Sequence, residues 1–472
     1  MLRTESHNLV LQTDSYKFTH WKQYPPGTEY VYSYLESRGG MFGQTVFFGL
    51  QYYLQRYLSG IVVTEEDVNE ARRFVDQHIG PGMFNYEGWI HIVRNQGGKL
   101  PVLIKAVAEG SVVDVSNVLM TIENTDPKCF WLPNYLETLL LKVWYPTTVG
   151  TLSRAIRRVI VSALERSGDP SSIDFKLHDF GYRGVSSEET AGIGAAAHLI
   201  NFKGTDTVAG IRVLQHYYDS QEMEGFSVPA AEHSTITAWG RENEALAYDN
   251  MLTQFPDGTV AVVSDSYNVY EAAGRLWGEV LHDKVLAREG TLVVRPDSGN
   301  PREVVLNVLE ILGEKFGYET NDKGYRVLNP KIRVIQGDGV NFWTIQDTLR
   351  AMNRASWSAD NITFGMGGAL LQQLNRDTQK FAFKTSNVTI NGEDYEVFKD
   401  PVEGHDKMSK RGRLALHFLN GIWSTDRARP DQVDYDDRLV PVFRDGEVLV
   451  KQSVAQIRER AATQGERVTL AT

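Results

Sequence analysis

Four consecutive β-turn-α units in the middle of the chain constrain its fold most strongly. Each begins with a short apolar segment, passes through a turn that contains Gly or Ser, and continues into a helical pattern. The apolar segments and their turns are Val260–Asp265, Leu292–Asp297, Ile332–Asp338 and Ile362–Gly365. They recur about every 30 to 40 residues, as strands of parallel βαβ units do. This region is therefore predicted to form a parallel sheet covered by helices.

A parallel sheet of this kind can close into an α/β barrel or remain open as a doubly wound sheet. Asp265, Asp297 and Asp338 each follow an apolar segment directly. Asp is a common turn residue, but three in consecutive units indicate a shared site. Because the active site of an α/β barrel lies at the carboxyl ends of its strands, this pattern favours the barrel.

The two ends of the chain show patterns typical of antiparallel sheets. Residues 28–35 alternate in a two-residue period, and a helix is predicted at Glu65–His78. Asn391-Gly392 and Asp445-Gly446 lie between apolar runs, which is a strong hairpin signal. A further helix is predicted at Val454–Thr463.

Because the termini of a domain often meet, we expect the two ends to pair with each other. The predicted fold class is α/β: an irregular TIM-like α/β barrel plus an antiparallel α+β domain built from the N- and C-terminal segments. The expected boundaries are 1–150 for the N-terminal part, 151–385 for the barrel, and 386–472 for the segment that completes the α+β domain.

The composition excludes several classes of protein. With a formal net charge of −11, the chain is a poor candidate for nucleic-acid binding, which needs basic surface. Cys129 is the single cysteine, so no intramolecular disulfide can form, and its surroundings indicate a packing role. No segment has the length and apolarity of a membrane span, and residues 1–17 lack a signal-peptide pattern. A cytoplasmic protein that does not bind membranes is expected.

Four further features could carry chemistry, although each also has a structural explanation. The glycines of Phe364–Gly368 could let backbone N–H groups approach a phosphate. Arg295 could bind a phosphate or form an internal salt bridge. His233, after Glu232, could act as an acid-base group or accept a phosphoryl group. Residues 176–187 combine an aromatic ring with an arginine, which suits a planar ring beside a phosphate. No metal-ligand spacing is present, and Mg²⁺ carried by substrate phosphates fits the carboxylates best.

Longer motifs resemble the nicotinamide phosphoribosyltransferases, members of the type II phosphoribosyltransferase family, over nearly the whole chain. The motifs are residues 13–17, 32–38, 177–187, 201–207, 227–240, 263–267, 294–301, 333–339 and 398–401. The resemblance implies a homodimer with active sites at the subunit interface. It also implies that nicotinamide and 5-phosphoribosyl pyrophosphate are joined with Mg²⁺, releasing diphosphate in NAD salvage. ATP hydrolysis through a phosphohistidine would favour the reaction.

The resemblance also implies a role for individual residues in binding the pyridine ring. Phe180 would stack on one face of the ring, with Tyr16 of the partner subunit on the other. Asp206 would accept a hydrogen bond from the carboxamide, and Ser227 and Ser264 would complete the substrate site. A carboxylate there would disfavour nicotinate, because like charges would be buried together.

The phosphates and the ribose are assigned to other residues on the same basis. Arg183 and Arg295 would contact diphosphate or the amide, and His233 would be the phosphorylated histidine. The ribose hydroxyls and the 5′-phosphate would be held by Asp297, Gly337 and Asp338, and by Gly367 and Gly368. Phosphate-binding residues contributed across the dimer would be Arg38, Arg376, Lys384 and Lys399.

Some positions depart from the family pattern. Asn268 stands where the family usually has an Asp that supports the histidine, so weaker ATP coupling is expected. Met366 and Ala369 replace a usual Ser and Gly in the phosphate loop. The alternatives to nicotinamide phosphoribosyltransferase activity are a nicotinate phosphoribosyltransferase and a non-catalytic signalling or binding protein.

Overall fold

The computed structural model describes residues 8–399, 409–428 and 434–463. The chain forms two compact units, which we call the barrel unit and the terminal unit. The barrel unit comprises Leu152–Leu214 and Gln221–Leu374. The terminal unit comprises Met1–Thr151, Gln215–Ser220 and Asn375–Thr472.

A six-stranded parallel sheet forms the centre of the barrel unit; it contains the four predicted strands and two that the sequence did not predict, β6 and β7. Its order is β7-β6-β13-β12-β9-β8, and each pair of neighbours is parallel. The strands are β6 (Leu177–Asp179), β7 (Gly204–Thr205), β8 (Asp257–Val263), β9 (Glu289–Arg295), β12 (Ile332–Gln336) and β13 (Ile362–Met366). Val, Ile and Leu side chains along these strands are buried, as expected for a sheet with two covered faces.

An irregular segment between β7 and β8 joins the two edges of this sheet. Gly204 forms a parallel bridge with Phe226, and Ala230 forms one with Ala261 of β8. Backbone hydrogen bonds of 2.7 to 3.0 Å accompany both bridges. The segment therefore takes the place of a strand and closes the sheet into an irregular α/β barrel, which confirms the predicted fold class.

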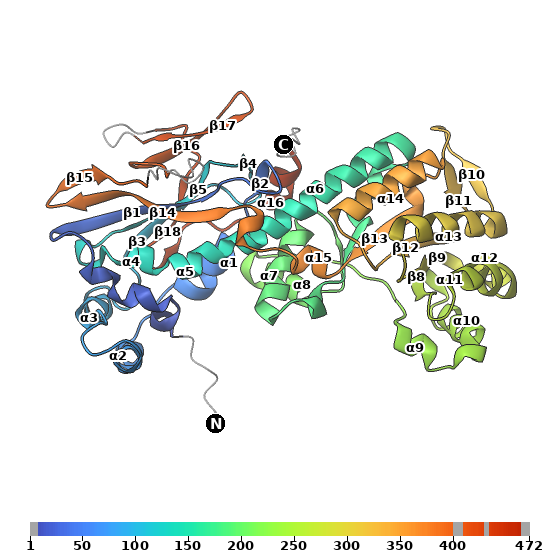
Figure 1. Ribbon diagram of the computed structural model, residues 1–472, viewed down its shortest axis with the longest axis horizontal. Coiled ribbons are helices and arrows are strands. Elements are labelled where there is room, and N and C mark those ends of the chain that lie inside the picture. The colour runs from blue at the N-terminus through green and yellow to red at the C-terminus, as the bar shows by residue number, and fades with distance from the viewer. Residues whose placement is uncertain (1–7, 400–408, 429–433, 464–472) are drawn as a thin grey trace. The chain divides into compact units, whose positions relative to one another are not determined.

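Helices cover the outside of the barrel. In Figure 1, α13 (Pro301–Phe316) and α14 (Phe342–Arg354) run side by side, and α13 packs against β12. The side chain of Asn300 accepts from the N–H of Arg302 and caps α13, and Pro301 occupies the first helical position. The other helices of this region are α6 (Trp144–Ser167), α7 (Glu188–Leu199), α8 (Val208–Tyr217), α9 (His233–Thr237), α10 (Glu244–Gln254), α11 (Val269–Glu271), the π-helix Ala272–Val280, α12 (His282–Ala287) and α15 (Gly368–Leu371). A small hairpin, β10 (Tyr318–Thr320) and β11 (Arg326–Leu328), follows α13.

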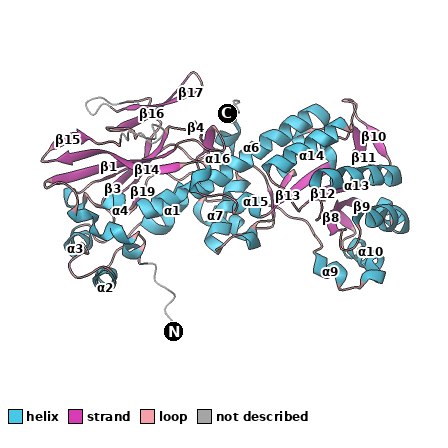
Figure 2. Ribbon diagram, viewed as in Figure 1, coloured by secondary structure: helices cyan, strands magenta, loops and turns pink. Residues whose placement is uncertain are grey.

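The terminal unit contains a seven-stranded antiparallel sheet built from both ends of the chain, as predicted (Figure 2). Its order is β15-β14-β1-β5-β3-β18-β19. The strands are β1 (Thr28–Ser37), β3 (Val102–Ala106), β5 (Val118–Asn124), β14 (Phe381–Ile390), β15 (Glu393–Glu396), β18 (Val440–Arg444) and β19 (Glu447–Val448). The expected boundary between 385 and 386 falls within β14.

Shorter elements complete the terminal unit. Two-stranded sheets pair β2 (Gln44–Val46) with β4 (Val112–Asp114) and β16 (Leu414–Leu419) with β17 (Ile422–Arg427). Its helices are α1 (Leu50–Tyr53), α2 (Glu65–His78), α3 (Tyr86–Asn95), α4 (Leu132–Tyr135), α5 (Glu137–Leu140) and α16 (Val454–Thr463). The first and last residues of α2 and of α16 are thus the ones that the sequence predicted. Among the described residues, none of the helices combines the length and the apolarity that crossing a bilayer requires.

Both predicted hairpins are present. Asn391-Gly392 joins β14 to β15, and Asp445-Gly446 joins β18 to β19. In each pair both residues have a positive φ, at 51° and 79° for the first and 49° and 85° for the second. The type I′ turn needs this backbone geometry, which explains why Asn, Asp and Gly occur there.

Candidate active site

Polar residues gather at the carboxyl ends of the barrel strands. Asp179 ends β6, Asp206 follows β7, Asp265 follows β8, Asp297 follows β9, and Asp338 follows β12. Because parallel strands end at the same edge of a sheet, these carboxylates surround one mouth of the barrel. The prediction that Asp265, Asp297 and Asp338 share this edge is therefore confirmed.

His233 lies at this mouth, between two of the carboxylates. It is the first residue of α9, directly after the segment that closes the barrel. Its Nε2 is 2.9 Å from Oδ1 of Asp265, and its Nδ1 is 4.0 Å from Oδ2 of Asp297. Ser298 donates to the other oxygen of Asp265 at 2.5 Å and fixes that carboxylate. The imidazole remains 46% exposed, so a ligand can reach it.

Asn268 does not support His233, contrary to the sequence-based expectation. Its side chain accepts from the N–H groups of Tyr270 and Glu271 and caps α11. The carboxylate that contacts the imidazole is Asp265, three positions earlier. The weaker ATP coupling expected from Asn268 stays a prediction, and Asp265 supplies the carboxylate that it assumed to be missing.

Asp297 and Arg295 form a charged pair at the end of β9. Nη2 of Arg295 lies 3.8 Å from Oδ2 of Asp297. Burial raises the pKa of Asp297 above its usual value, with Arg295 opposing and Asp265 and Asp338 adding to the shift. Nε of Arg295 is buried without a hydrogen-bond partner among the described residues. The mouth thus combines crowded carboxylates with an unused guanidinium donor.

Gly365 makes room for the Phe180 ring, and Gly337 makes room for the Asp297 carboxylate beside it. A Cβ at Gly365, in β13, would lie 1.9 Å from Cε2 of Phe180. A Cβ at Gly337 would lie 3.6 Å from the same atom and 2.6 Å from Oδ1 of Asp297. His178 is a further neighbour, with its ring centroid 5.1 Å from that of Phe180. The ring therefore lies against the backbone of β13 at Gly365, where there is no space for a side chain.

Asp206 is an ionised acceptor that bonds to His178, the neighbour of this ring. Its Oδ1 accepts hydrogen bonds from His178 Nε2 at 2.9 Å and from Ser227 Oγ at 2.5 Å. Burial alone would raise the pKa of Asp206, but the bonds from His178 and Ser227 and the charge of Arg295 lower it overall. Within the part of the chain that the structure describes, Oδ2 accepts no hydrogen bond and is available to a ligand.

The glycine turn after β13 also faces the loop of Phe180. A Cβ at Gly367 would lie 3.6 Å from the Phe180 carbonyl oxygen, and one at Gly368 would meet nothing within 4 Å. α15, which begins at Gly368, is a single turn without a side-chain cap, so its first N–H groups remain available to an anion. Arg183 is exposed in the short 3₁₀ helix Tyr182–Gly184.

Ser264 is placed differently from the other predicted residues. Its side chain is fully buried at the end of β8. Its hydroxyl donates to the Val262 carbonyl at 2.9 Å and accepts from Trp277 Nε1 at 3.1 Å. The structure therefore gives Ser264 a role in holding the end of β8.

The predicted phosphate-binding residues of the terminal unit meet in one cavity. This cavity has a volume of about 410 Å³, and its walls include Arg38, Arg376, Lys384 and Lys399 together with Lys380 and Glu137. Burial lowers the pKa of Lys384; the nearby Glu137 opposes this shift, and the charges of Arg38, Lys399 and Arg376 add to it. Such crowding of cations is costly unless an anion occupies the space, so this cavity suits a phosphate group.

Tyr16 is in the terminal unit as well, within the 3₁₀ helix Ser15–Lys22. Its ring is 60% exposed and packs edge-on against His20.

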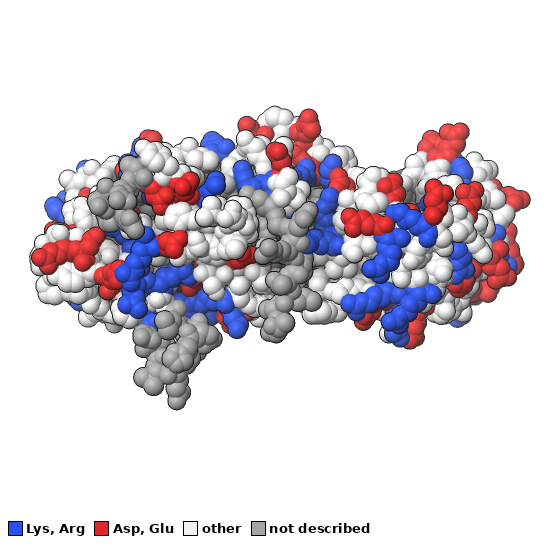
Figure 3. All heavy atoms as spheres, turned by 90° about the horizontal axis from the view of Figure 1, so that it is seen from above, with Lys and Arg blue, Asp and Glu red and all other residues white. Residues whose placement is uncertain are grey.

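Of the motif at residues 398–401, Asp400 and Pro401 lie outside the described residues. Figure 3 shows that Lys and Arg side chains gather in local groups, despite the net negative charge of the chain.

Sequence reasoning did not assign a role to His178, Asp179 or Gly365. His178 is 28 positions from Asp206, and the buried Asp179 accepts from the N–H of Gly181 and from Thr205 Oγ1. Gly365 was treated only as part of a turn motif. The sequence contains one indication of a role for these residues: they lie in the segments 176–187 and 364–368, which contain Phe180 and the glycine turn.

A closed barrel with carboxylates, an arginine and free glycine N–H groups at its mouth is the arrangement of an enzyme that handles a sugar phosphate. A sequence model described as the nicotinate phosphoribosyltransferase (NAPRTase) family matches residues 175–447. A second, described as the N-terminal domain of nicotinamide phosphoribosyltransferase, matches residues 8–104. The chain therefore belongs to the nicotinate phosphoribosyltransferase family.

Individual relatives agree with this assignment. A nicotinamide phosphoribosyltransferase of Xanthomonas campestris is 50% identical over 463 residues, covering 96% of this chain and 98% of the relative. One from Acinetobacter baylyi is 30% identical over 491 residues, covering 96% and 97%. The crystal structure of a nicotinate-nucleotide pyrophosphorylase from Pyrococcus furiosus has the same fold, with a TM-score of 0.61 and 16% identity, covering 98% of this chain and 97% of that one.

Proposed function

We propose that this protein transfers the phosphoribosyl group of 5-phosphoribosyl pyrophosphate to nicotinamide, forming nicotinamide mononucleotide and diphosphate. The observation that carries this proposal is the ionised carboxylate of Asp206, which bonds to His178 beside the Phe180 ring. An ionised carboxylate accepts from the carboxamide NH₂ of nicotinamide, whereas the carboxylate of nicotinate would be repelled. The relatives named above support the same substrate.

The pyridine ring would stack on Phe180, whose position is fixed by Gly365 and His178. Asp206 would then set the rotation of the ring through its free oxygen, since His178 and Ser227 hold the other. This orientation directs N1 of nicotinamide toward the sugar. Holding both reactants in this way removes much of the entropic barrier to their reaction.

In the reaction, N1 of nicotinamide forms a bond to C1′ of the ribose as the bond from C1′ to the diphosphate oxygen breaks. The electron pair of the broken bond leaves with diphosphate, and positive charge develops on the ribose ring. Arg295, with its unused Nε, would donate to the departing diphosphate. Asp297 and Asp338 would bind the ribose hydroxyls, while the N–H groups of Gly367 and Gly368 would bind the 5′-phosphate.

Mg²⁺ fits the chemistry of this mouth. Asp265, Asp297 and Asp338 crowd together enough that the first and last raise the pKa of Asp297. Oxygen-rich, negatively charged sites of this kind favour Mg²⁺ with its waters and substrate phosphates. When bound, the ion would neutralise charge on the diphosphate. Asp297 and Asp338 are the residues that would hold it.

ATP would be used through phosphorylation of His233. The hydrogen bond to Asp265 fixes Nε2 as the donor, so the lone pair is on Nδ1. Nδ1 would attack the γ-phosphorus of ATP, forming an N–P bond as the bond to ADP breaks. The exposure of the imidazole supports this role, and Asp297, 4.0 Å from Nδ1, would need the ion to offset its charge.

The functional enzyme would be a homodimer with shared active sites. In this arrangement the partner subunit's Tyr16 covers the second face of the pyridine ring. The partner's cationic cavity, which contains its Arg38, Arg376, Lys384 and Lys399, binds phosphates. The gathering of four cations in the wall of one cavity supports the proposal, because their charges lower the pKa of Lys384 and a bound phosphate would offset them.

The deciding experiment is incubation of the purified protein with nicotinamide, 5-phosphoribosyl pyrophosphate and Mg²⁺, with and without ATP, followed by mass detection. Nicotinamide mononucleotide is the expected product, and ATP should increase its yield. Parallel reactions with nicotinate test the related activity, and preference for nicotinate would overturn the substrate assignment. Absence of product from both rings would instead indicate a non-catalytic binding protein.

A further inference from the structure

Three side chains of metal-binding types meet in the terminal unit, away from the residues assigned above. They are His91, Asp126 and Cys129, and one ligand atom of each lies within 4.8 Å of the other two. Within the described ranges, no other group of three His, Cys, Asp or Glu residues satisfies this condition. We infer that these three residues form a binding site for a zinc ion.

Local structure holds two of the three ligands in register. Asp126 caps the 3₁₀ helix Pro127–Cys129, and its side chain accepts from the N–H of Lys128 at 2.9 Å. The N–H of Cys129 donates to the Asp126 carbonyl at 2.9 Å. In 3₁₀ geometry, side chains three positions apart lie one above the other. Asp126 and Cys129 therefore present their ligand atoms on the same side of this turn.

His91 supplies the third ligand from α3, which packs against this 3₁₀ helix. Its Nε2 lies 2.7 Å from Oδ2 of Asp126. The side chains of His91 and Asp126 are only 16% and 15% exposed, and Cys129 is fully buried. The site is thus built on two ordered elements and largely shielded from solvent, which strengthens the attraction of a cation.

Gln96 adds an outer contact of the kind that supports metal ligands. Its Nε2 donates to Oδ2 of Asp126 at 2.7 Å. Ligating carboxylates usually accept such a hydrogen bond, which orients them and tunes their basicity. The Asp126 side chain is therefore fixed from two directions, by Gln96 and by the backbone of Lys128.

The donor set selects the metal. Imidazole nitrogen, carboxylate oxygen and thiolate sulfur together suit Zn²⁺, which prefers a tetrahedral arrangement of such atoms. Two tetrahedral ligands about 2.0 Å from zinc lie roughly 3.3 Å apart. Nε2 and Oδ2 must therefore separate by a few tenths of an ångström as the ion replaces the proton between them. A sulfur–zinc bond also replaces the S–H bond of Cys129, and that proton goes to solvent.

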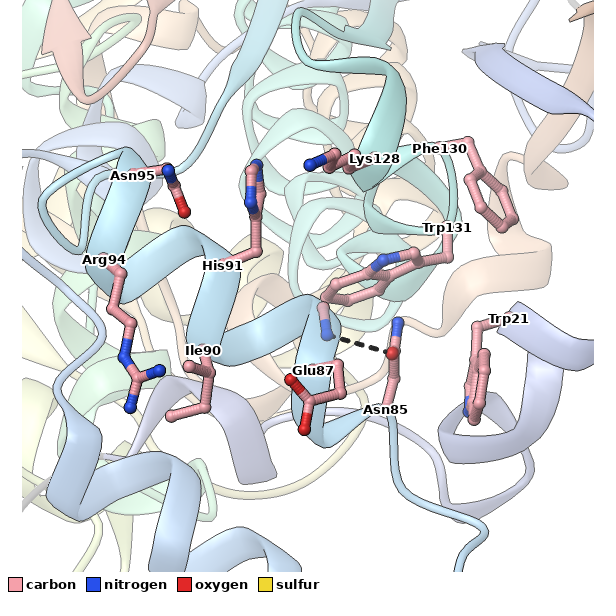
Figure 4. Close-up of a pocket in the computed structure, with 11 residues that line it drawn as sticks. Trp21, Asn85, Glu87, Ile90, His91, Arg94, Asn95, Lys128, Phe130 and Trp131 are labelled. Carbon is pink, nitrogen blue, oxygen red and sulfur yellow. Dashed lines mark hydrogen bonds between the residues drawn. The ribbon is translucent and has the colours of Figure 1, made fainter.

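A cavity beside the site gives the ion a route and a fourth ligand. Its volume is about 420 Å³, and its walls include Trp21, Asn85, His91, Lys128 and Trp131. Figure 4 shows His91 on α3 opposite the segment of Lys128 and Trp131, with the cavity between them. His91 belongs to both the cavity wall and the ligand set. Water from this cavity would complete the tetrahedron.

Cobalt titration tests this inference directly. The untagged, chelator-stripped protein is titrated with Co²⁺, and absorption from thiolate-to-cobalt charge transfer is recorded in the near ultraviolet. Because Cys129 is the single cysteine of the chain, such a band can arise only there. The band should saturate at one equivalent per chain and disappear when Zn²⁺ is added, since zinc displaces cobalt at such sites.

Variants separate this site from other places that could bind a cation. Cys129→Ser should abolish the band, and His91→Gln and Gln96→Ala should each weaken cobalt binding, the latter by about 10- to 100-fold. The matched control is His282→Gln, because His282 contacts Asp283 at 3.1 Å without a thiol nearby. This control should leave the titration unchanged.

The inference is overturned if folded wild-type protein shows no charge-transfer band at saturating cobalt. It is also overturned if His91→Gln binds cobalt as tightly as the wild type does. Circular dichroism establishes that each variant is folded. If Cys129→Ser does not fold, the wild-type and His91→Gln titrations still decide the result.

Discussion

At the scale of single residues, Asp206 determines which pyridine the proposed site accepts. His178 and Ser227 hold one of its oxygens, and their hydrogen bonds keep the pKa of the carboxyl below its usual value despite burial. The group is therefore charged at neutral pH. A charged acceptor favours an amide and disfavours a second carboxylate.

Replacement of Asp206 by Asn tests this role. Asn can still pair with an amide, but it no longer repels nicotinate, so the ratio of kcat/KM for nicotinamide to that for nicotinate should fall by about tenfold or more. Steady-state kinetics with both substrates measure the ratio. Asp322→Asn, at an exposed turn, is the control. An unchanged ratio in Asp206→Asn would contradict the assignment.

Gly365 is a second residue whose change has a specific expected effect. Its substitution by Ala would place a Cβ 1.9 Å from the Phe180 ring, so the ring must move. Because misplacement by about 1 Å can cost about 100-fold in rate, kcat/KM for nicotinamide should fall by at least tenfold.

The matched control for this change is Gly274→Ala, where the added Cβ would lie 3.6 Å from Ile311, an ordinary van der Waals distance. Activity should survive there. Full activity in Gly365→Ala, in a protein with wild-type circular dichroism, would show that the ring position is unimportant.

At the scale of elements, the β16–β17 hairpin contains a pH-sensitive contact. Nδ1 of His417 lies 2.8 Å from Oδ2 of Asp426, and Nε2 lies 2.8 Å from Oδ2 of Asp434. Partial burial would lower the pKa of His417, but these two hydrogen bonds raise it overall. The imidazolium form therefore joins β16 to Asp426 of β17 and to Asp434.

The direction of the shift determines the pH dependence. Because the folded-state pKa of His417 exceeds the unfolded value of 6.5, its stabilisation is complete below pH 6.5 and is lost as the pH rises through the folded-state pKa. The difference in melting temperature between the wild type and His417→Gln should therefore shrink from pH 6 toward pH 9. Differential scanning fluorimetry measures it, and a constant difference would refute the charge-based explanation.

At the scale of the whole molecule, the proposed residues divide between the two units. His233, Arg295 and Asp297 belong to the barrel unit, whereas Arg38, Arg376 and Lys384 belong to the terminal unit. If each active site combines the barrel unit of one subunit with the terminal unit of the other, two inactive variants can complement each other. Asp297→Asn and Arg376→Ala provide such a pair.

If the two variants pair at random in a refolded equimolar mixture, half of the dimers are mixed. In a mixed dimer, one site contains both substitutions and the other site contains neither. The mixture should therefore recover about a quarter of wild-type activity. Each variant refolded alone is the control. Activity no greater than that of the separate variants would contradict shared sites.

Local patterns in the sequence were sufficient for the elements and for much of the site. Four of the six parallel strands, α2, α13, α16 and both hairpins follow from periodicity, caps and turn residues that act over a few positions. Asp297 and Asp338 could be located because a strand carries its terminal residues to a known edge of the sheet. The phosphate-binding cations of the terminal unit came from family resemblance, since they are scattered along the sequence.

Contacts between distant residues could be decided only by the tertiary structure. These include the closure of the barrel by an irregular segment, the choice of Asp265 over Asn268 as the partner of His233, and the meeting of His91 with Cys129. In each case the residues lie 30 or more positions apart, or the backbone has no regular period to read. The sequence therefore determined which groups each strand and turn presents, and packing determined which of those groups meet.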